Sequence, residues 1–194
     1  MKPSLTCCSR YALLALMSAG LIGCASVTMP PPTATASTVE KLRAARLAPA
    51  TTDRFGLAAG VSPEMDHSLS GLRGSSIQGA NGSFSQQLKE VIITELKAAG
   101  LYDEKSDIQI GGELTDSQVD AAIGTGTARL AARFTVDRAG KRVFDKPLAV
   151  DASWESSFVG AIAIPEAMNQ YSALYKLLAA KLFEDADFRA ALAR

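Results

Sequence analysis

The fold is decided by the stretch Thr125–Asp137, TGTARLAARFTVD, the turn Arg138–Lys141, RAGK, and the returning stretch Arg142–Trp154, RVFDKPLAVDASW. Along the first stretch, apolar side chains alternate with arginine and threonine, which is the period of a strand with one buried face. The glycine-containing turn predicts that the second stretch runs back antiparallel to the first. Because proline cannot donate a ladder hydrogen bond, Pro147 predicts an edge position or a bulge for the returning strand.

Two helices are expected to cover this sheet. Residues 84–99 carry an apolar face at helical spacing, with Ser83 placed to cap the start and Gly100 placed to end the helix. The second helix is expected to begin at Pro165, a residue suited to a first helical turn, and its apolar spacing continues to Leu182.

Shorter elements complete the predicted domain. Arg54–Val61 and Asp107–Leu114 have strand patterns, and a last short helix is expected from Asp185. Ser62–Gly82 is expected to be a long glycine-rich loop with a short strand near Ile77. The order of elements predicts an α+β fold of two layers, in which a mostly antiparallel sheet carries the two main helices on one face.

The composition restricts the classes of fold and function that the chain can have. The chain has 194 residues, of which 47% are hydrophobic and 21% charged, so one packed domain is expected. Its 20 Lys and Arg balance 20 Asp and Glu, which argues against nucleic-acid binding by bulk phosphate neutralisation.

The first residues have the pattern of a secretory signal. Lys2 and Arg10 make a short basic region, and the apolar stretch Tyr11–Ile22 that follows is too short to cross a bilayer. It ends in Leu21-Ile22-Gly23-Cys24, which resembles the lipobox of bacterial lipoproteins. The resemblance implies that the Cys24 thiol receives a diacylglycerol, that cleavage follows residue 23, and that a fatty acid such as palmitate acylates the new terminus.

The positions of the cysteines fit this hypothesis. Cys7 and Cys8 lie in the segment that would be discarded, and residues 25–194 contain no cysteine. The residue after Cys24 is Ala25 rather than aspartate, which in Gram-negative lipoproteins resembles the default for transport to the outer membrane, on its periplasmic face.

Three regions are therefore expected: a signal peptide over 1–23, a lipidated cysteine and tether over 24–52, and a single domain over 53–194. Residues 25–38 are rich in proline, threonine, alanine and serine, which is typical of a linker. Val39–Leu47 fits a short amphipathic helix, but we favour more tether or a first edge strand.

Candidate catalytic and metal-binding residues are few. His67, the only histidine, stands beside Glu64 and Asp66, but the chain has no second histidine and no cysteine in the expected domain to complete a zinc site. No serine lies in a G-x-S-x-G motif, and the glycine-rich stretches lack the lysine of a phosphate loop. We expect no catalytic residue, no metal, no cofactor and no enzymatic activity.

The most unusual stretch is Trp154–Pro165, WESSFVGAIAIP. One interpretation is that its apolar residues belong to the core and the rest forms an ordered loop. The other is that it is an exposed apolar contact surface, in which Trp154 and Phe158 anchor a partner or lipid.

In its organisation the chain resembles accessory lipoproteins of the bacterial envelope, among them the YajG type and the auxiliary lipoproteins of ABC-type lipid transport. The resemblance implies a non-enzymatic, lipid-anchored protein that binds an envelope partner or supports assembly. The alternatives are an auxiliary subunit of a lipid-transport system and an envelope hydrolase, for which His67 is the only plausible base.

Overall fold

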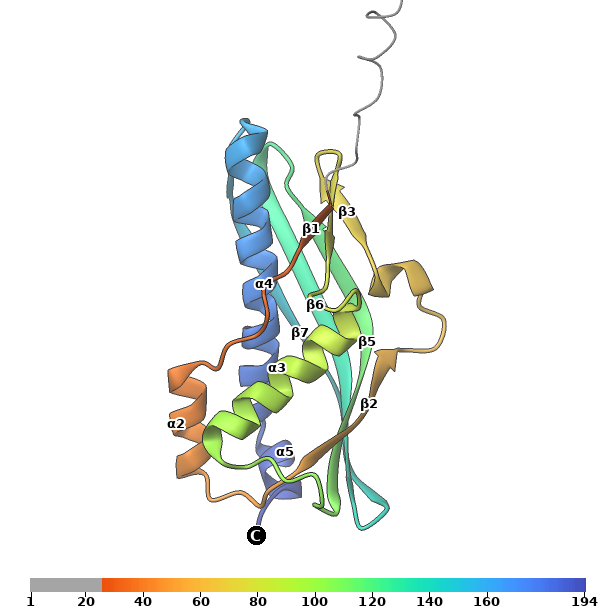
Figure 1. Ribbon diagram of the computed structural model, residues 1–194, viewed down its shortest axis with the longest axis vertical. Coiled ribbons are helices and arrows are strands. Elements are labelled where there is room, and N and C mark those ends of the chain that lie inside the picture. The colour runs from red at the N-terminus through yellow and green to blue at the C-terminus, as the bar shows by residue number, and fades with distance from the viewer. Residues whose placement is uncertain (1–25) are drawn as a thin grey trace, which may run out of the picture.

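The computed structural model describes residues 26–194 and centres on a four-stranded sheet in the order β2-β5-β6-β7 (Figure 1). The strands are β2 (Thr51–Leu57), β5 (Ile108–Asp120), β6 (Gly124–Arg138) and β7 (Lys141–Ser156). The meander β5-β6-β7 is antiparallel, and β7 lies at the edge, where Pro147 faces Arg133 of β6. β2 departs from the antiparallel expectation, because a crossover of about 50 residues separates it from β5 and the two strands run parallel.

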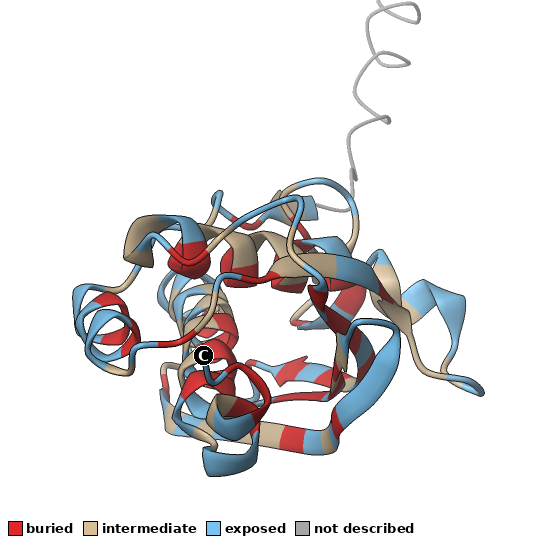
Figure 2. Cartoon of the chain, turned by 90° about the horizontal axis from the view of Figure 1, so that it is seen from below, coloured by how far each residue is buried: buried red, intermediate tan, exposed pale blue. Residues whose placement is uncertain are grey.

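The two main helices pack on one face of this sheet, as expected (Figure 1). They are α3 (Phe84–Ala99) and α4 (Gly160–Glu184), and the short α5 (Ala186–Ala191) follows them. Buried residues lie on the inward sides of helices and strands (Figure 2), and they include Ile110, Leu130 and Phe134 of the sheet. The two-layer α+β architecture is thus confirmed.

The ends of α3 and α5 also confirm the sequence pattern. Ser83 Oγ accepts a hydrogen bond from the Gln86 amide at 3.2 Å, and Gly100 ends α3 with φ +74°. Asp185 caps α5 by accepting from the amides of Asp187 and Phe188.

The start of α4 differs from the prediction at Pro165. The helix begins five residues earlier, because the Val159 carbonyl accepts from the amides of Ile162 and Ala163 and closes a first turn. Pro165 then lies within the helix, where its missing N–H leaves the exposed first turn one hydrogen bond short.

A small second sheet replaces most of the loop expected over Ser62–Gly82. Its strands are β1 (Ser26–Thr28), β4 (Ser75–Gln78) and β3 (Leu69–Leu72), in the order β1-β4-β3, and the short 3₁₀ helix η1 (Pro63–Asp66) precedes β3 in the chain. Ile77, the residue near which a strand was expected, lies in β4 and is fully buried.

The tether expected over residues 24–52 is wrong for the part that the structure describes. After β1, the chain forms the helix α2 (Ala36–Ala44), and Met29, Leu42 and Leu47 are each at most 3% exposed. The Ala48 amide also donates to the Leu192 carbonyl at 2.7 Å. Val39 and Leu42 are buried one turn apart on α2, so the amphipathic helix that Val39–Leu47 also fits is the one that forms. The composition before α2 resembles a linker because few of its residues, such as Met29, are buried.

The signal peptide expected over 1–23 and Cys24 lie outside the described residues. Within residues 26–194, no helix has the length and apolar character needed to cross a membrane.

We expect Leu42→Ala to lower the free energy of unfolding by about 2–5 kcal/mol, because it leaves a cavity where α2 packs against the domain. Urea unfolding of the purified protein measures this change. The matched control is Leu177→Ala on α4, where the leucine is 52% exposed and the expected cost is well under 1 kcal/mol. Equal midpoints for Leu42→Ala and the wild type would show that residues 36–44 are a free tether.

Candidate functional site

The residues first considered for metal binding or catalysis stabilise the loop before α3. Asp66 accepts from Ser83 Oγ and from the Ser85 amide, both at 2.7 Å, and so caps the start of α3. His67 Nδ1 lies 2.7 Å from the Gly82 carbonyl, and Glu64 bonds to Ser62. Within residues 26–194, no group of three potential metal ligands converges.

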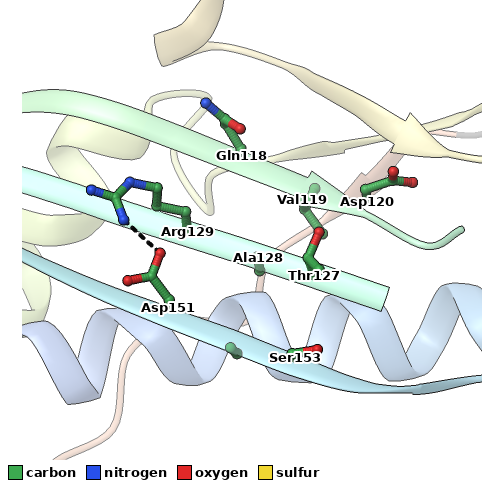
Figure 3. Close-up of a pocket in the computed structure, with 9 residues that line it drawn as sticks. Gln118, Val119, Asp120, Thr127, Ala128, Arg129, Asp151 and Ser153 are labelled. Atoms are coloured by element: carbon green, nitrogen blue, oxygen red, sulfur yellow. Dashed lines mark hydrogen bonds and ion pairs between the residues drawn. The ribbon is translucent and has the colours of Figure 1, made fainter. Parts of the chain in front are cut away.

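The outer face of the sheet, away from the helices, carries a ladder of exposed ion pairs. Arg129 Nη1 lies 2.6 Å from Asp151 Oδ1, and its Nε lies 3.0 Å from Asp116 Oδ2. Arg129 and Asp151 line an open hollow of about 510 Å³ on the strands β5, β6 and β7 (Figure 3). Further along the sheet, Arg133 pairs with Asp145 at 2.5 Å. This face is therefore polar, solvated and lined with paired charges.

Two members of these pairs, Asp145 and Arg129, have shifted pKa values. The hydrogen bond from Arg133 lowers the pKa of Asp145; burial opposes this shift, and the charges of Arg133 and Arg142 add to the lowering. The hydrogen bond and charge of Asp151 raise the pKa of Arg129. A carboxylate with a lowered pKa is a poor proton donor near neutral pH, so Asp145 is not a candidate general acid.

Three segments that are distant in sequence meet at one end of the molecule, where α4 begins (Figure 1). They are the β3–β4 turn, the β5–β6 turn and the β7–α4 junction. Arg73 of the first turn joins them. Its Nε donates to the Ala121 carbonyl at 2.6 Å, Nη2 donates to the Ser157 carbonyl at 2.6 Å, and Nη1 donates to the Phe158 carbonyl at 3.0 Å.

Arg73 holds this position in a strained backbone. Its φ is +52° and that of Gly74 is +91°, so the two residues form the two-residue turn that suits the twist of a hairpin. A left-handed arginine is unfavourable by itself, and the three carbonyl contacts retain it. Sequence reasoning missed Arg73, although an Arg-Gly pair between Leu72 and Ser75 is a recognisable hairpin signal.

The end organised by Arg73 exposes an apolar surface, which we call the apolar tip. It consists of four residues, with exposed fractions of 78% for Phe158, 72% for Ile123, 61% for Ile162 and 37% for Val159. Ile123 immediately precedes Gly124, which is the β6 partner of Ser156, so the β5–β6 turn and the start of α4 lie side by side. An exposed apolar cluster of this kind is typical of a contact surface.

The structure separates the two residues expected as contact anchors. Phe158 is the most exposed residue of the apolar tip, whereas Trp154 is half-buried on the helix-facing side of the sheet. Its ring covers Gly126, where an added Cβ would lie 2.2 Å from the indole. Trp154 Nε1 is buried and has no hydrogen-bond partner among the described residues. Trp154 therefore packs beneath the tip, and Phe158 is the exposed candidate.

No protein-family model matches the chain, and no curated protein matches its sequence. Among solved structures, the chain is similar to a Xanthomonas campestris protein of family DUF330, with a TM-score of 0.54 and 11% identity over 86% of this chain and 93% of that one. At this identity the likeness shows a shared fold.

Two further similarities are weaker. A Caulobacter crescentus protein gives a TM-score of 0.43 with 13% identity, covering 81% of this chain and 96% of that one. A minor lipoprotein from Acinetobacter baumannii gives 0.37 with 16% identity, covering 75% and 91%. These scores are too low to support an argument about this chain.

We expect Arg73→Asn to speed amide exchange in residues 121–124 and 156–159 by about 10- to 100-fold, because asparagine tolerates the left-handed backbone but cannot reach the three carbonyls. Hydrogen exchange by mass spectrometry measures this loss. Arg46→Asn is the matched control, since Arg46 also has φ +52° and its side chain is exposed far from the tip. Unchanged exchange in Arg73→Asn would mean that the guanidinium does not hold the tip together.

We expect the pKa of Asp145, followed by carboxyl-carbon NMR, to lie below its ordinary value and to rise towards it in Arg133→Ala. Because the folded pKa is the lower one, the ion pair stabilises the fold above the unfolded pKa and loses this effect as the pH falls through the folded pKa. Asp103, which makes no ion pair among the described residues, is the internal reference. An Asp145 pKa insensitive to Arg133→Ala would contradict the pairing.

Proposed function

We propose that this chain is a non-enzymatic lipoprotein of the bacterial envelope, anchored through lipid on Cys24 to the periplasmic face of the outer membrane, and that the apolar tip is its contact surface. The observation that carries the proposal is the position of the lipobox. Leu21-Ile22-Gly23-Cys24 ends two residues before Ser26, where β1 begins the folded domain.

The described side chains support binding rather than catalysis. His67 and Asp66 are engaged in the loop before α3, and Asp151 and Asp145 of the outer face are paired with arginines. The exposed residues of the apolar tip have no such structural role. Contact surfaces are enriched in exposed aromatic and aliphatic residues of this kind.

Growth of a Gram-negative host with an alkyne-tagged palmitate tests the anchor. We expect the wild type to be labelled, to sediment with membranes and to begin at residue 24, because the lipobox cysteine is the acylated residue. Cys24→Ala should lose the label and keep its leader. Cys8→Ala is the matched control and should be labelled like the wild type, since Cys8 precedes the cleavage position.

Density-gradient separation of the two membranes tests the location. The wild type should band with the outer membrane, and Ala25→Asp should shift the protein to the inner membrane. A wild type that carries no lipid, or that stays in the soluble fraction with Met1 intact, would refute the proposal.

A further inference from the structure

Building on the proposed lipid anchor, we infer that the apolar tip rests in the interfacial layer of the bilayer that holds the lipid of Cys24. The partner of this surface is then the membrane itself, and the domain lies against it in one fixed orientation. Three observations carry the inference: the short connection to the anchor, the end of the molecule at which that connection starts, and the chemistry of the tip.

The connection between the anchor and the domain is a single residue. Ser26 already pairs with Ser76 in the small sheet, and the Met29 amide donates to the Gln78 carbonyl at 2.9 Å. Only Ala25 lies between Ser26 and Cys24. Because one residue spans at most about 3.6 Å, the lipidated cysteine lies within about 7 Å of Ser26. The connection is therefore too short for the folded domain to move away from the membrane surface.

The start of β1 lies at the same end of the molecule as the apolar tip (Figure 1). Ser76, the partner of Ser26, belongs to the hairpin whose turn contains Arg73. The guanidinium of Arg73 contacts the carbonyls of Ala121 and Phe158, on the two segments that carry the exposed apolar residues. The C-terminal helix α5 lies at the opposite end. A bilayer held at Cys24 is therefore adjacent to the tip.

The tip has the chemistry of a segment that enters the interface. Residues 121–128 and 156–165 contain no charged side chain, and Phe158, Ile123 and Ile162 project from them with exposed fractions above 60%. Three backbone carbonyls of this end, those of Ala121, Ser157 and Phe158, already accept hydrogen bonds from Arg73, which lowers their cost of leaving water.

The cation at this end, Arg73, donates to the carbonyls of Ala121, Ser157 and Phe158, and the charged residues next to the tip in sequence are acidic: Asp120, Glu155 and Glu166. Acidic flanks give no attraction to anionic lipid, so contact with the bilayer depends on apolar area and on the anchor. We therefore expect the tip to enter zwitterionic bilayers.

Site-specific labelling tests the inference on the full lipidated protein. Residues 25–194 contain no cysteine and lipidation consumes the Cys24 thiol, so Phe158→Cys and Ile162→Cys each give one site for the environment-sensitive dye NBD. Both side chains are exposed, and their replacement leaves the core intact. Val143→Cys is the matched control, because Val143 is 45% exposed and lines a surface with Ala190 and Ala191 at the α5 end.

The proteins are reconstituted in phosphatidylcholine–phosphatidylethanolamine vesicles with and without nitroxide-labelled lipid. We expect dyes at positions 158 and 162 to shift to the blue and to lose most of their emission to the nitroxide, whereas the dye at 143 keeps an aqueous spectrum. Blue-shifted emission that nitroxide lipid does not quench would show that protein, such as a second copy of the chain, covers the tip, and would overturn the inference.

Equal quenching at positions 143 and 158, or an aqueous spectrum at both 158 and 162, would also overturn it. The mass of the Cys24 peptide is measured on the same samples. A lipidated protein with an aqueous tip refutes the inference and leaves the proposed function standing, whereas an unlipidated Cys24 refutes the proposed function itself.

Discussion

The structure depends on the difference between the two faces of the β5-β6-β7 meander. One face is apolar, with Leu130 and Phe134 buried beneath α3 and α4, and the other presents Arg129 and Arg133 to solvent. A strand of 16 residues spans about 50 Å, and a helix of 25 residues about 37 Å, so α4 covers most of the length of β7. Burial of one long face therefore produces an elongated domain with two distinct ends.

At the end where α4 begins, one side chain organises three segments. The guanidinium of Arg73 satisfies carbonyls of the β5–β6 turn and the β7–α4 junction, and its own backbone turns the β3–β4 hairpin. These contacts allow Phe158 and Ile123 to remain exposed on an ordered surface. Exposed apolar residues cost little when the backbone beneath them is satisfied, so a contact surface can be maintained without a partner.

The segment between the lipobox and β2 determines how far the apolar tip can move from Cys24. It is folded over the domain through β1, α2 and the buried residues Met29 and Leu42, so the domain begins directly after the proposed anchor. A free tether would let the domain rotate away from the membrane. With the proposed anchor on Cys24, a folded segment would hold the apolar tip beside the lipid, and the fold would then set the orientation of the domain.

The sequence by itself determined the meander and α3 with its caps at Ser83 and Gly100, because each is encoded by a local period or a short motif. The lipobox at Cys24 rests on a short motif in the same way and stays a prediction. Only the tertiary structure decided that residues 26–47 are packed, that β2 runs parallel to β5, and that Trp154 lies inward while Phe158 lies outward. These outcomes depend on surfaces supplied by distant elements. The physical reason is that local patterns record which side chains leave water, whereas the partner that buries each one is set by the chain as a whole.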